Sequence, residues 1–297
     1  MTIGKKRSVL ALLPMALSAV LLSACGGGSS GSSEGSLSLG VTDAPVDSAS
    51  KVIVEFDGVE VQPADGERIT FDFAQPRHIN LLDLQGGISR ALLENEPVPA
   101  GKYEWVRLMV NADGQTSSSY IEMDDGSVYP LRIPSGAQTG LKLQGGFTVP
   151  ENGQTLLTVD FDLRKSVHKP GQSGRAYILR PALRMVQNDD VGTIVGTVDQ
   201  STASAADCEP AAYLYAGSDV QPDDMGSANA PMTTTAIEMN NESGDYEFTF
   251  AFIPAGDYTV AWTCAADQDT PDADEDIPFE AQTNVTVAAG SEVTAGF

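Results

Sequence analysis

The sequence predicts an all-β protein with two β-sandwich domains in tandem, preceded by a cleaved signal peptide and a flexible linker. Three observations support this prediction. Apolar residues alternate with a period of two along most of the chain, turn residues separate these runs, and the charge composition changes abruptly near residue 190. Alternation with period two gives a strand one apolar face, and many short strands with few helices favour sandwiches.

Residues 1–24 predict a lipoprotein signal peptide. A basic start, Lys5-Lys6-Arg7, precedes an apolar run over 9–22, which is shorter than the roughly 20 residues that a membrane-spanning helix needs. The ending Leu22-Ser23-Ala24-Cys25 resembles the bacterial lipobox, in which cleavage precedes a cysteine that then receives acyl chains such as palmitate. The resemblance implies a lipid anchor at Cys25. An ordinary secretory signal with an incidental cysteine is the alternative.

Residues 25–36 are rich in Gly and Ser, and this composition predicts a flexible linker with an end-to-end distance of about 18 Å. Gly26 stands where lipoproteins of the inner membrane usually have Asp. The resemblance therefore implies attachment to the outer membrane, on either its periplasmic or its outer face.

The mature chain is strongly acidic. Without Lys5, Lys6 and Arg7, 14 Lys and Arg remain against 41 Asp and Glu, a formal charge near −27. This balance argues against nucleic acid as a partner, because phosphate binding needs clustered cations. Residues 191–297 contain 19 of the acids and no Lys or Arg. The break predicts one domain over 37–188 and a second, immunoglobulin-like or prealbumin-like domain over 191–297.

Beyond Cys25 the chain has two cysteines, Cys208 and Cys264, both in the second predicted domain. In an exported protein an isolated pair predicts a disulfide, here closing a loop between positions 56 apart.

Strands are predicted from the alternating runs in both domains. In the first domain they lie around 51–61, 67–74, 120–133, 154–167 and 176–186, and in the second around 192–200, 211–217, 234–239, 245–253, 257–264, 279–287 and 291–297. One stretch differs. The apolar residues Ile88, Leu92 and Leu93 have helical spacing and end before Pro97, so residues 86–97 predict a short helix. The motif Pro-Ala-Gly-x-Tyr occurs at 99–103 and 254–258, where it predicts a turn that leads into a strand.

The first domain resembles a bacterial lipoprotein module known as domain of unknown function 4382. Six ordered segments support the resemblance, among them "LGVTDAPVD" (39–47), "INLLDLQGG" (79–87) and "VDFDLRKSV" (159–167). The resemblance covers about 36–186 and implies an exported, lipid-anchored β-sandwich without a known activity. The second domain more loosely resembles carboxypeptidase regulatory-like and prealbumin-like modules, a fold that carbohydrate-binding sandwiches also use.

The acidic stretch "ADQDTPDADEDIP" follows Cys264 and suggests two alternatives. Its carboxylates are Asp267, Asp269, Asp272, Asp274 and Asp276, with Glu275 between the last two. The pattern favours a solvated, self-repelling loop. The alternative is weak Ca²⁺ binding, because Ca²⁺ prefers hard oxygen ligands. The sequence indicates no other cofactor.

Six polar residues of the first domain form a candidate cluster: Asp43, Ser135, Lys142, Asp160, Asp162 and Lys165. Asp160 and Asp162 flank Phe161 and would share one strand face. Two carboxylates on one face can act as acid and base in glycoside cleavage. The favoured alternative is an outward-facing pair bridged to the nearby cations Arg164 and Lys165. Asp43 is predicted to cap a turn before Pro45.

These patterns predict a non-catalytic cell-envelope lipoprotein that binds or organises an envelope component, either protein or glycan. Carbohydrate binding or adhesion by the second domain is one alternative. An enzyme that acts on polysaccharide through Asp160 and Asp162 is another. The convergence of the six polar residues in one pocket would favour binding or catalysis, and their dispersal would favour a scaffold.

Overall fold

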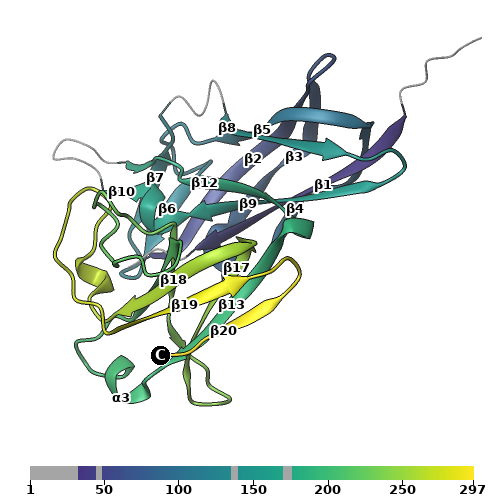
Figure 1. Cartoon of the computed structure of the whole chain (residues 1–297). Coiled ribbons are helices and arrows are strands. Elements are labelled where there is room, and N and C mark those ends of the chain that lie inside the picture. The colour runs from purple at the N-terminus through teal and green to yellow at the C-terminus, as the bar shows by residue number, and fades with distance from the viewer. Residues whose placement is uncertain (1–32, 45–48, 135–139, 170–175) are drawn as a thin grey trace, which may run out of the picture. The chain divides into compact units, whose positions relative to one another are not determined.

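The computed structural model describes residues 33–297 except 45–48, 135–139 and 170–175 (Figure 1). Most of these residues lie in two pairs of β-sheets. The N-terminal pair contains β1(Glu34–Ala44), β2(Ala49–Pro63), β3(Ile69–Asn80), η1(Leu81–Leu84), β4(Arg90–Pro99), β5(Gly101–Asn111), β6(Tyr120–Met123), β7(Val128–Arg132), β8(Leu141–Val149), β9(Gln154–Asp162), α2(Leu163–Ser166), β10(Val167–His168), β11(Tyr177–Leu179) and β12(Leu183–Gln187). The C-terminal pair contains β13(Val191–Val198), α3(Gln200–Ala203), β14(Ala211–Ala216), β15(Thr233–Ala236), β16(Glu238–Met239), β17(Tyr246–Pro254), β18(Gly256–Thr263), η3(Ala266–Gln268), β19(Ala281–Val287) and β20(Glu292–Ala295). The short turn η2(Asn188–Asp190) joins the two pairs.

The N-terminal pair packs a four-stranded sheet, β12-β9-β1-β4, on a larger sheet with the order β10-β11-β7-β6-β2-β5-β8, in which β3 also pairs with β2. Strand β1 runs parallel to β9 and antiparallel to β4. The two sheets meet in a continuous hydrophobic core. At its centre the rings of Phe56 on β2 and Phe161 on β9 contact edge to face, with centroids 6.2 Å apart. Aromatic pairs in this geometry stabilise a core beyond their area of burial.

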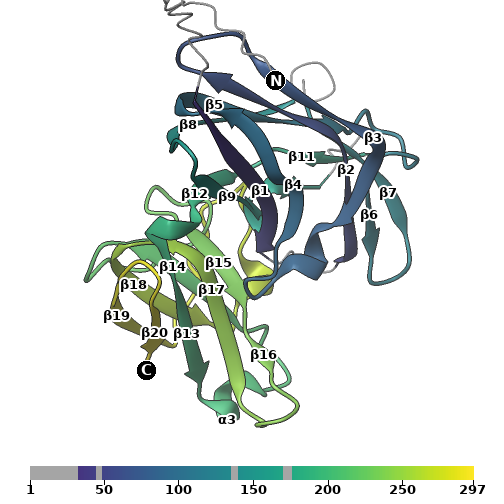
Figure 2. The same ribbon diagram turned by 90° about the vertical axis from the view of Figure 1, so that its right-hand side faces the viewer.

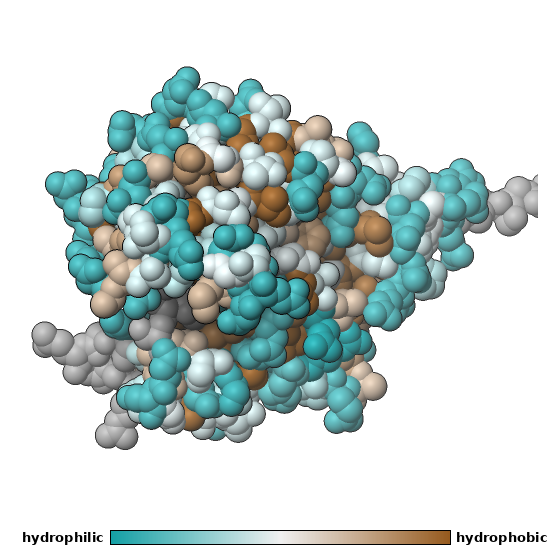
Figure 3. Space-filling model, turned by 90° about the horizontal axis from the view of Figure 1, so that it is seen from below, coloured by the Kyte–Doolittle hydropathy of each residue, from teal (hydrophilic) through white to brown (hydrophobic). Residues whose placement is uncertain are grey.

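The C-terminal pair repeats this design with shorter strands (Figure 2). One sheet has the order β16-β17-β13-β20 and the other β15-β14-β18-β19. Their facing sides bury Ile194, Phe250, Val260 and Trp262 in a second core. The predicted all-β sandwich fold is therefore confirmed. The space-filling view from below shows mainly hydrophilic residues with hydrophobic ones scattered among them (Figure 3).

The two Pro-Ala-Gly-x-Tyr motifs connect the two sheets of each sandwich. The first joins β4 to β5 and the second joins β17 to β18, and in both cases the two strands belong to different sheets. The hydroxyl of Tyr103 donates a hydrogen bond of 2.8 Å to the carbonyl of Pro99, and Tyr258 does the same to Pro254. Each tyrosine is buried as a residue, so the bond satisfies a hydroxyl that has little contact with water. The prediction of a turn that leads into a strand is confirmed at both sites, and each turn is a corner between two sheets.

The helix predicted over 86–97 is wrong, because Arg90–Pro99 form β4 on the edge of the β1 sheet. The adjacent Leu92 and Leu93 are both buried, which breaks the period of two. The register between β1 and β4 shifts on both sides of Leu39, and Asn95 has a φ of 53°. Such bulges insert extra residues into a strand and so imitate helical spacing. Ile88 precedes the strand and is exposed.

Three predicted strand boundaries also change. The run 154–167 is a strand to Asp162 and then a turn of helix, α2. The run 176–186 divides into β11 and β12, which lie in different sheets, with Pro181 between them. The run 234–239 divides into β15 and β16. Strand β1 begins at Glu34, so the last residues of the predicted linker belong to the sheet.

Cys208 and Cys264 form the predicted disulfide. It ties the segment before β14 to the end of β18, next to the acidic loop. Within the described ranges, no helix combines the length and the apolar character that crossing a bilayer requires. The signal peptide and Cys25 lie outside the described residues.

Candidate functional site

Four of the six predicted polar residues come together where β1 and β9 end. The parallel register pairs Thr42 with Asp160 and Asp43 with Phe161, which places Asp43 beside the two aspartates of β9. Asp43, Asp160 and Asp162 are all buried, and Lys165 follows in α2. Asp43 is thus the second-last residue of β1, and the turn at Pro45 that it was predicted to cap lies outside the described residues.

Asp160 is engaged in an ion pair. Its Oδ2 lies 2.6 Å from Nη2 of Arg184, which occupies the directly paired position on β12. The prediction of a bridged carboxylate holds for Asp160, but the partner is Arg184 and not Arg164 or Lys165. The carboxylate is also buried and not outward-facing.

Asp162 caps the helical turn α2. Its Oδ1 accepts a hydrogen bond of 3.2 Å from the backbone N–H of Lys165. Burial raises the pKa of Asp162 to about 6, and the nearby charge of Lys165 limits this rise. Burial likewise lowers the pKa of Lys165, whose Nζ donates a hydrogen bond to the backbone carbonyl of Pro231 in the C-terminal sheet pair. These two side chains thus contribute to local structure and to the contact between the sheet pairs.

The other two predicted residues do not join this group as far as the structure describes them. Lys142 lies on β8, where its Nζ is 4.5 Å from the centre of the Trp105 ring. Arg107 contacts the same ring, with Cζ 4.9 Å from its centre. Ser135 lies outside the described residues.

Arg164, which sequence reasoning left as a nearby cation, is the central side chain of the junction. It is 3% exposed, and Nη2 donates a hydrogen bond of 2.7 Å to the carbonyl of Ala266. Nη1 lies 3.3 Å from the hydroxyl of Tyr213, which donates in turn to Oδ2 of Asp269 at 2.5 Å. Arg164 belongs to the N-terminal sheet pair and the other three residues to the C-terminal pair. We call this set the arginine junction.

The acidic loop lies against the protein and is not a freely solvated tip over its whole length. Asp269 is buried, and both carboxylate oxygens of Asp272 lie 3.0 Å from Nδ1 of His168. His168 is the second residue of the short strand β10. Phe279 packs on Tyr213 edge to face, with ring centroids 5.3 Å apart, which helps to hold the loop over the outer face of β14. Asp267, Asp274 and Asp276 remain exposed.

The five acids predicted to bind Ca²⁺ do not form one group. Two sets of three carboxylates place their oxygens within 4.8 Å of one another, and both contain Asp224, which the sequence-based prediction did not include. The first set is Asp223, Asp224 and Asp274, and the second is Asp224, Asp269 and Glu275. Neither set found among the described residues contains Asp267, Asp272 or Asp276.

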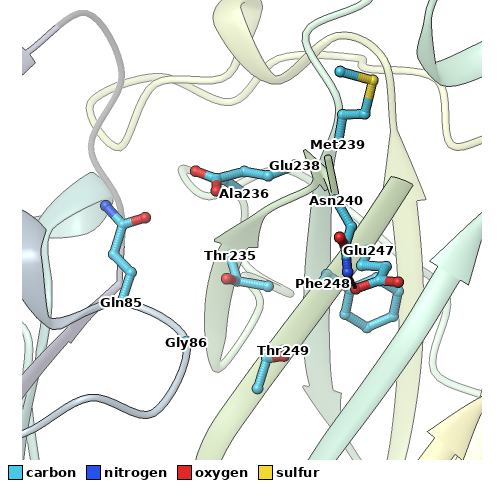
Figure 4. Close-up of a pocket in the computed structure, with 10 residues that line it drawn as sticks. All are labelled: Gln85, Gly86, Thr235, Ala236, Glu238, Met239, Asn240, Glu247, Phe248 and Thr249. Atoms are coloured by element: carbon cyan, nitrogen blue, oxygen red, sulfur yellow. Dashed lines mark hydrogen bonds between the residues drawn. The ribbon is translucent and has the colours of Figure 1, made fainter. Parts of the chain in front are cut away.

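A polar pocket of about 270 Å³ lies between the segment after η1 and the strands β15 to β17 (Figure 4). Its lining residues are Gln85, Gly86, Thr235, Ala236, Glu238, Met239, Asn240, Glu247, Phe248 and Thr249. Nδ2 of Asn240 donates a hydrogen bond of 2.9 Å to Oε2 of Glu247. Glu238 and Glu247 occupy paired positions on β16 and β17, and both line the pocket. Phe248 is buried and offers no exposed ring for stacking on a sugar.

Sequence reasoning missed the residues of the pocket, the part that Asp224 plays in both carboxylate groups and the central position of Arg164 for a common reason. Asp224, Arg164 and Asn240 lie in unrelated segments, and each has an ordinary local sequence context. One signal was available: residues 191–297 contain no Lys or Arg, so any side-chain cation for the buried acids of this segment must come from elsewhere.

Comparison with known proteins supports the family resemblance of the N-terminal part. Residues 34–181 match the family model described as "Domain of unknown function (DUF4382)", which confirms the predicted resemblance to this family over about 36–186. No curated protein matches the chain.

Several solved structures show remote similarity. The TIE protein of Bacillus anthracis is 12% identical, with 88% of this chain and 33% of that chain covered and a TM-score of 0.19. The minor pilin GBS52 of Streptococcus agalactiae is 10% identical, with coverages of 88% and 94% and a TM-score of 0.18. A putative adhesin of Bacteroides thetaiotaomicron is 10% identical, with coverages of 79% and 77% and a TM-score of 0.19. The chain spans about a third of the length of the first of these, and similarity this low supports no functional argument.

Proposed function

We propose that the chain is a non-catalytic lipoprotein of the bacterial outer membrane, anchored through Cys25, that binds or organises a component of the cell envelope. The observation that carries the non-catalytic part of this proposal is that the side chains of the polar cluster are engaged in structural contacts. Asp160 pairs with Arg184, Asp162 caps α2, and Lys165 contacts the carbonyl of Pro231. Side chains that an acid–base mechanism would require are thus engaged in holding strands and sheet pairs together.

The anchor is tested by metabolic labelling with an alkyne analogue of palmitate. A two-membrane bacterium that expresses the full chain should incorporate the label, and the protein should sediment with outer membranes. The variant Cys25→Ala should lose both properties. Labelling that persists in Cys25→Ala would contradict the anchor.

The binding role is tested by photo-crosslinking in intact cells. Met239 lies at the pocket of Figure 4 and is 49% exposed, whereas Val128 lies at the start of β7 and is 47% exposed. A photoreactive residue at position 239 should yield a defined adduct with an envelope component, and position 128 serves as a control of matched exposure. If neither position gives an adduct, this pocket is not the binding surface.

Carbohydrate binding is a second candidate, and the polar lining of the same pocket favours it. Carboxylate and amide groups such as those of Glu247 and Asn240 can hydrogen-bond to sugar hydroxyls. Peptidoglycan pull-down and glycan arrays should show binding that Asn240→Ala and Glu247→Gln abolish. Glu242→Gln, in the exposed turn outside the pocket, is the matched control.

A polysaccharide-acting enzyme is the least supported reading. It would require Asp160 and Asp162 as the reacting carboxylates. The double variant Asp160→Asn/Asp162→Asn, compared with the wild type for release of reducing ends from envelope polysaccharide, decides this question. A loss of activity in a variant that remains folded would revive the enzyme reading.

A further inference from the structure

Asp224 is fully buried at the point where two loops of the C-terminal sheet pair meet. One loop joins β14 to β15, and the other is the acidic loop after Cys264. Oδ1 of Asp224 accepts a hydrogen bond of 2.7 Å from the N–H of Gly226. Oδ2 is buried and has no hydrogen-bond partner among the described residues. A buried carboxylate oxygen without a partner is costly, so this position calls for a proton or a cation.

Asp224 is surrounded by other acidic side chains, and its own part of the chain supplies no Lys or Arg. Carboxylate oxygens of Asp224, Asp269 and Glu275 lie within 4.8 Å of one another, as do those of Asp223, Asp224 and Asp274. Residues 191–297 contain no Lys or Arg.

The spacing of these oxygens suits one ion. Two oxygens on opposite sides of a Ca²⁺ ion, each bound at about 2.4 Å, are about 4.8 Å apart. The donors are all carboxylates, with no His or Cys in either group, which selects a hard cation and disfavours zinc. Irregular loops provide the adaptable coordination that Ca²⁺ accepts, whereas Mg²⁺ demands near-ideal octahedral geometry.

We propose that Asp224, Asp269 and Glu275 bind one Ca²⁺ ion, with the more exposed Asp223 and Asp274 completing its shell directly or through water. The ion joins the β14–β15 loop to the acidic loop. The close approach of these loops requires Gly226, because a Cβ at this position would lie 1.6 Å from the carbonyl oxygen of Ala273. The loops already meet at Asp269, whose Oδ1 accepts from the N–H of Met225 at 3.0 Å.

The proposed ion also acts on the arginine junction. Oδ2 of Asp269 accepts from Tyr213, whose hydroxyl lies against Arg164 of the other sheet pair. A cation at Asp269 would keep this carboxylate ionised and fixed. Binding of Ca²⁺ should therefore stiffen the contact between the two sheet pairs as well as the two loops.

The test uses the full chain purified in detergent and measures its affinity for Ca²⁺ and its Tm in CaCl₂ compared with EDTA. We expect a dissociation constant of about 10⁻⁴ to 10⁻³ M, the range of extracellular modules. At ten times this concentration the Tm should rise by about 3 to 5 °C. Tb³⁺ in place of Ca²⁺ should give luminescence sensitised by Tyr213. Glu275→Gln should weaken binding at least tenfold, and Asp276→Asn, an exposed acid in the same loop outside both groups, should not.

Asp224→Asn separates binding from a merely structural role. In EDTA this variant should melt at a higher temperature than the wild type, because it removes a buried charge. In saturating CaCl₂ the order should reverse. Absence of any Ca²⁺-dependent shift at several millimolar would overturn the proposal. So would an equal shift with MgCl₂ or with NaCl of matched ionic strength, or equal losses in Asp276→Asn and Glu275→Gln.

Discussion

Nη2 of Arg184 lies 2.6 Å from Oδ2 of Asp160, and the two residues occupy directly paired positions on β12 and β9. The side chains are 22% and 11% exposed, so the pair is largely withdrawn from water. Partly buried ion pairs are costly to break from one side, because the remaining charge stays buried. This relationship makes Asp160 a structural residue of the β12–β9 ladder.

Asp160→Ala should lower the free energy of unfolding by about 2 to 3 kcal/mol, because it leaves the Arg184 guanidinium without its carboxylate. The double variant Asp160→Ala/Arg184→Met should lose less than the sum of the two single variants. Urea unfolding of the four proteins measures both quantities. Lys51 and Glu122 form a control pair at 2.9 Å that is far more exposed, and breaking it should cost much less stability than breaking the Asp160–Arg184 pair. Equal costs for the two pairs would contradict this role of Asp160.

The pKa of Asp162 makes stability depend on pH in an unusual direction for an aspartate. The folded protein holds the proton with a pKa of about 6, against a reference value of 3.8. The folded state binds this proton more tightly than the unfolded state does. Protonation of Asp162 therefore adds to the free energy of unfolding, and this contribution is fully present below about pH 4. It is lost as the pH rises to about 6, with a change of up to about 3 kcal/mol.

Asp162→Asn should remove this part of the pH profile while keeping an oxygen that can accept from the N–H of Lys165. Unfolding free energies measured between pH 4 and pH 7 test it. The variant should lose less stability than the wild type across this range and should be at least as stable at pH 7. Parallel profiles of the two proteins would show that the carboxyl group does not titrate in this window.

Arg164→Met should destabilise the protein by about 3 kcal/mol. The substitution keeps an apolar chain of similar length but leaves the carbonyl of Ala266 without this donor and removes a cation near the buried Asp269. Thermal and urea unfolding measure the loss. Arg180→Met is the control, because Arg180 is 61% exposed and lies 3.8 Å from Asp272. It should change stability by less than about 1 kcal/mol, and an Arg164→Met effect of that size would contradict a central role for the arginine junction.

The two Pro-Ala-Gly-x-Tyr motifs predict the same loss of stability when either tyrosine hydroxyl is removed. Tyr103→Phe and Tyr258→Phe each remove one hydroxyl that donates to a proline carbonyl, and each should cost about 1 kcal/mol. The ring of Tyr103 remains stacked on Phe147, with centroids 4.8 Å apart, so the loss should come from the hydrogen bond alone. Denaturant unfolding of the two variants and of their combination should give additive losses. A neutral effect at both sites would show that the corner does not depend on the hydroxyl.

Local patterns predicted those parts of the fold in which each strand follows a regular period. The alternation in 51–61 and 245–253 identifies β2 and β17, and the isolated cysteine pair identifies the disulfide. The same reasoning misread 86–97, because two bulges in β4 make buried leucines adjacent and so remove the period of two. It could not place β11 and β12 in different sheets, since the division depends on pairing with β7 and β9, which lie far away in the sequence.

The sequence by itself determined that this chain is a strand-rich, acidic protein whose last 107 residues contain no Lys or Arg, with one disulfide and a lipobox-like start. These properties depend only on composition and on the short-range spacing of residues. Only the tertiary structure decided which acids meet. Asp224 joins Asp269 and Glu275, while Asp276 stays apart, because electrostatic energy depends on distance in space and the folded loops set that distance.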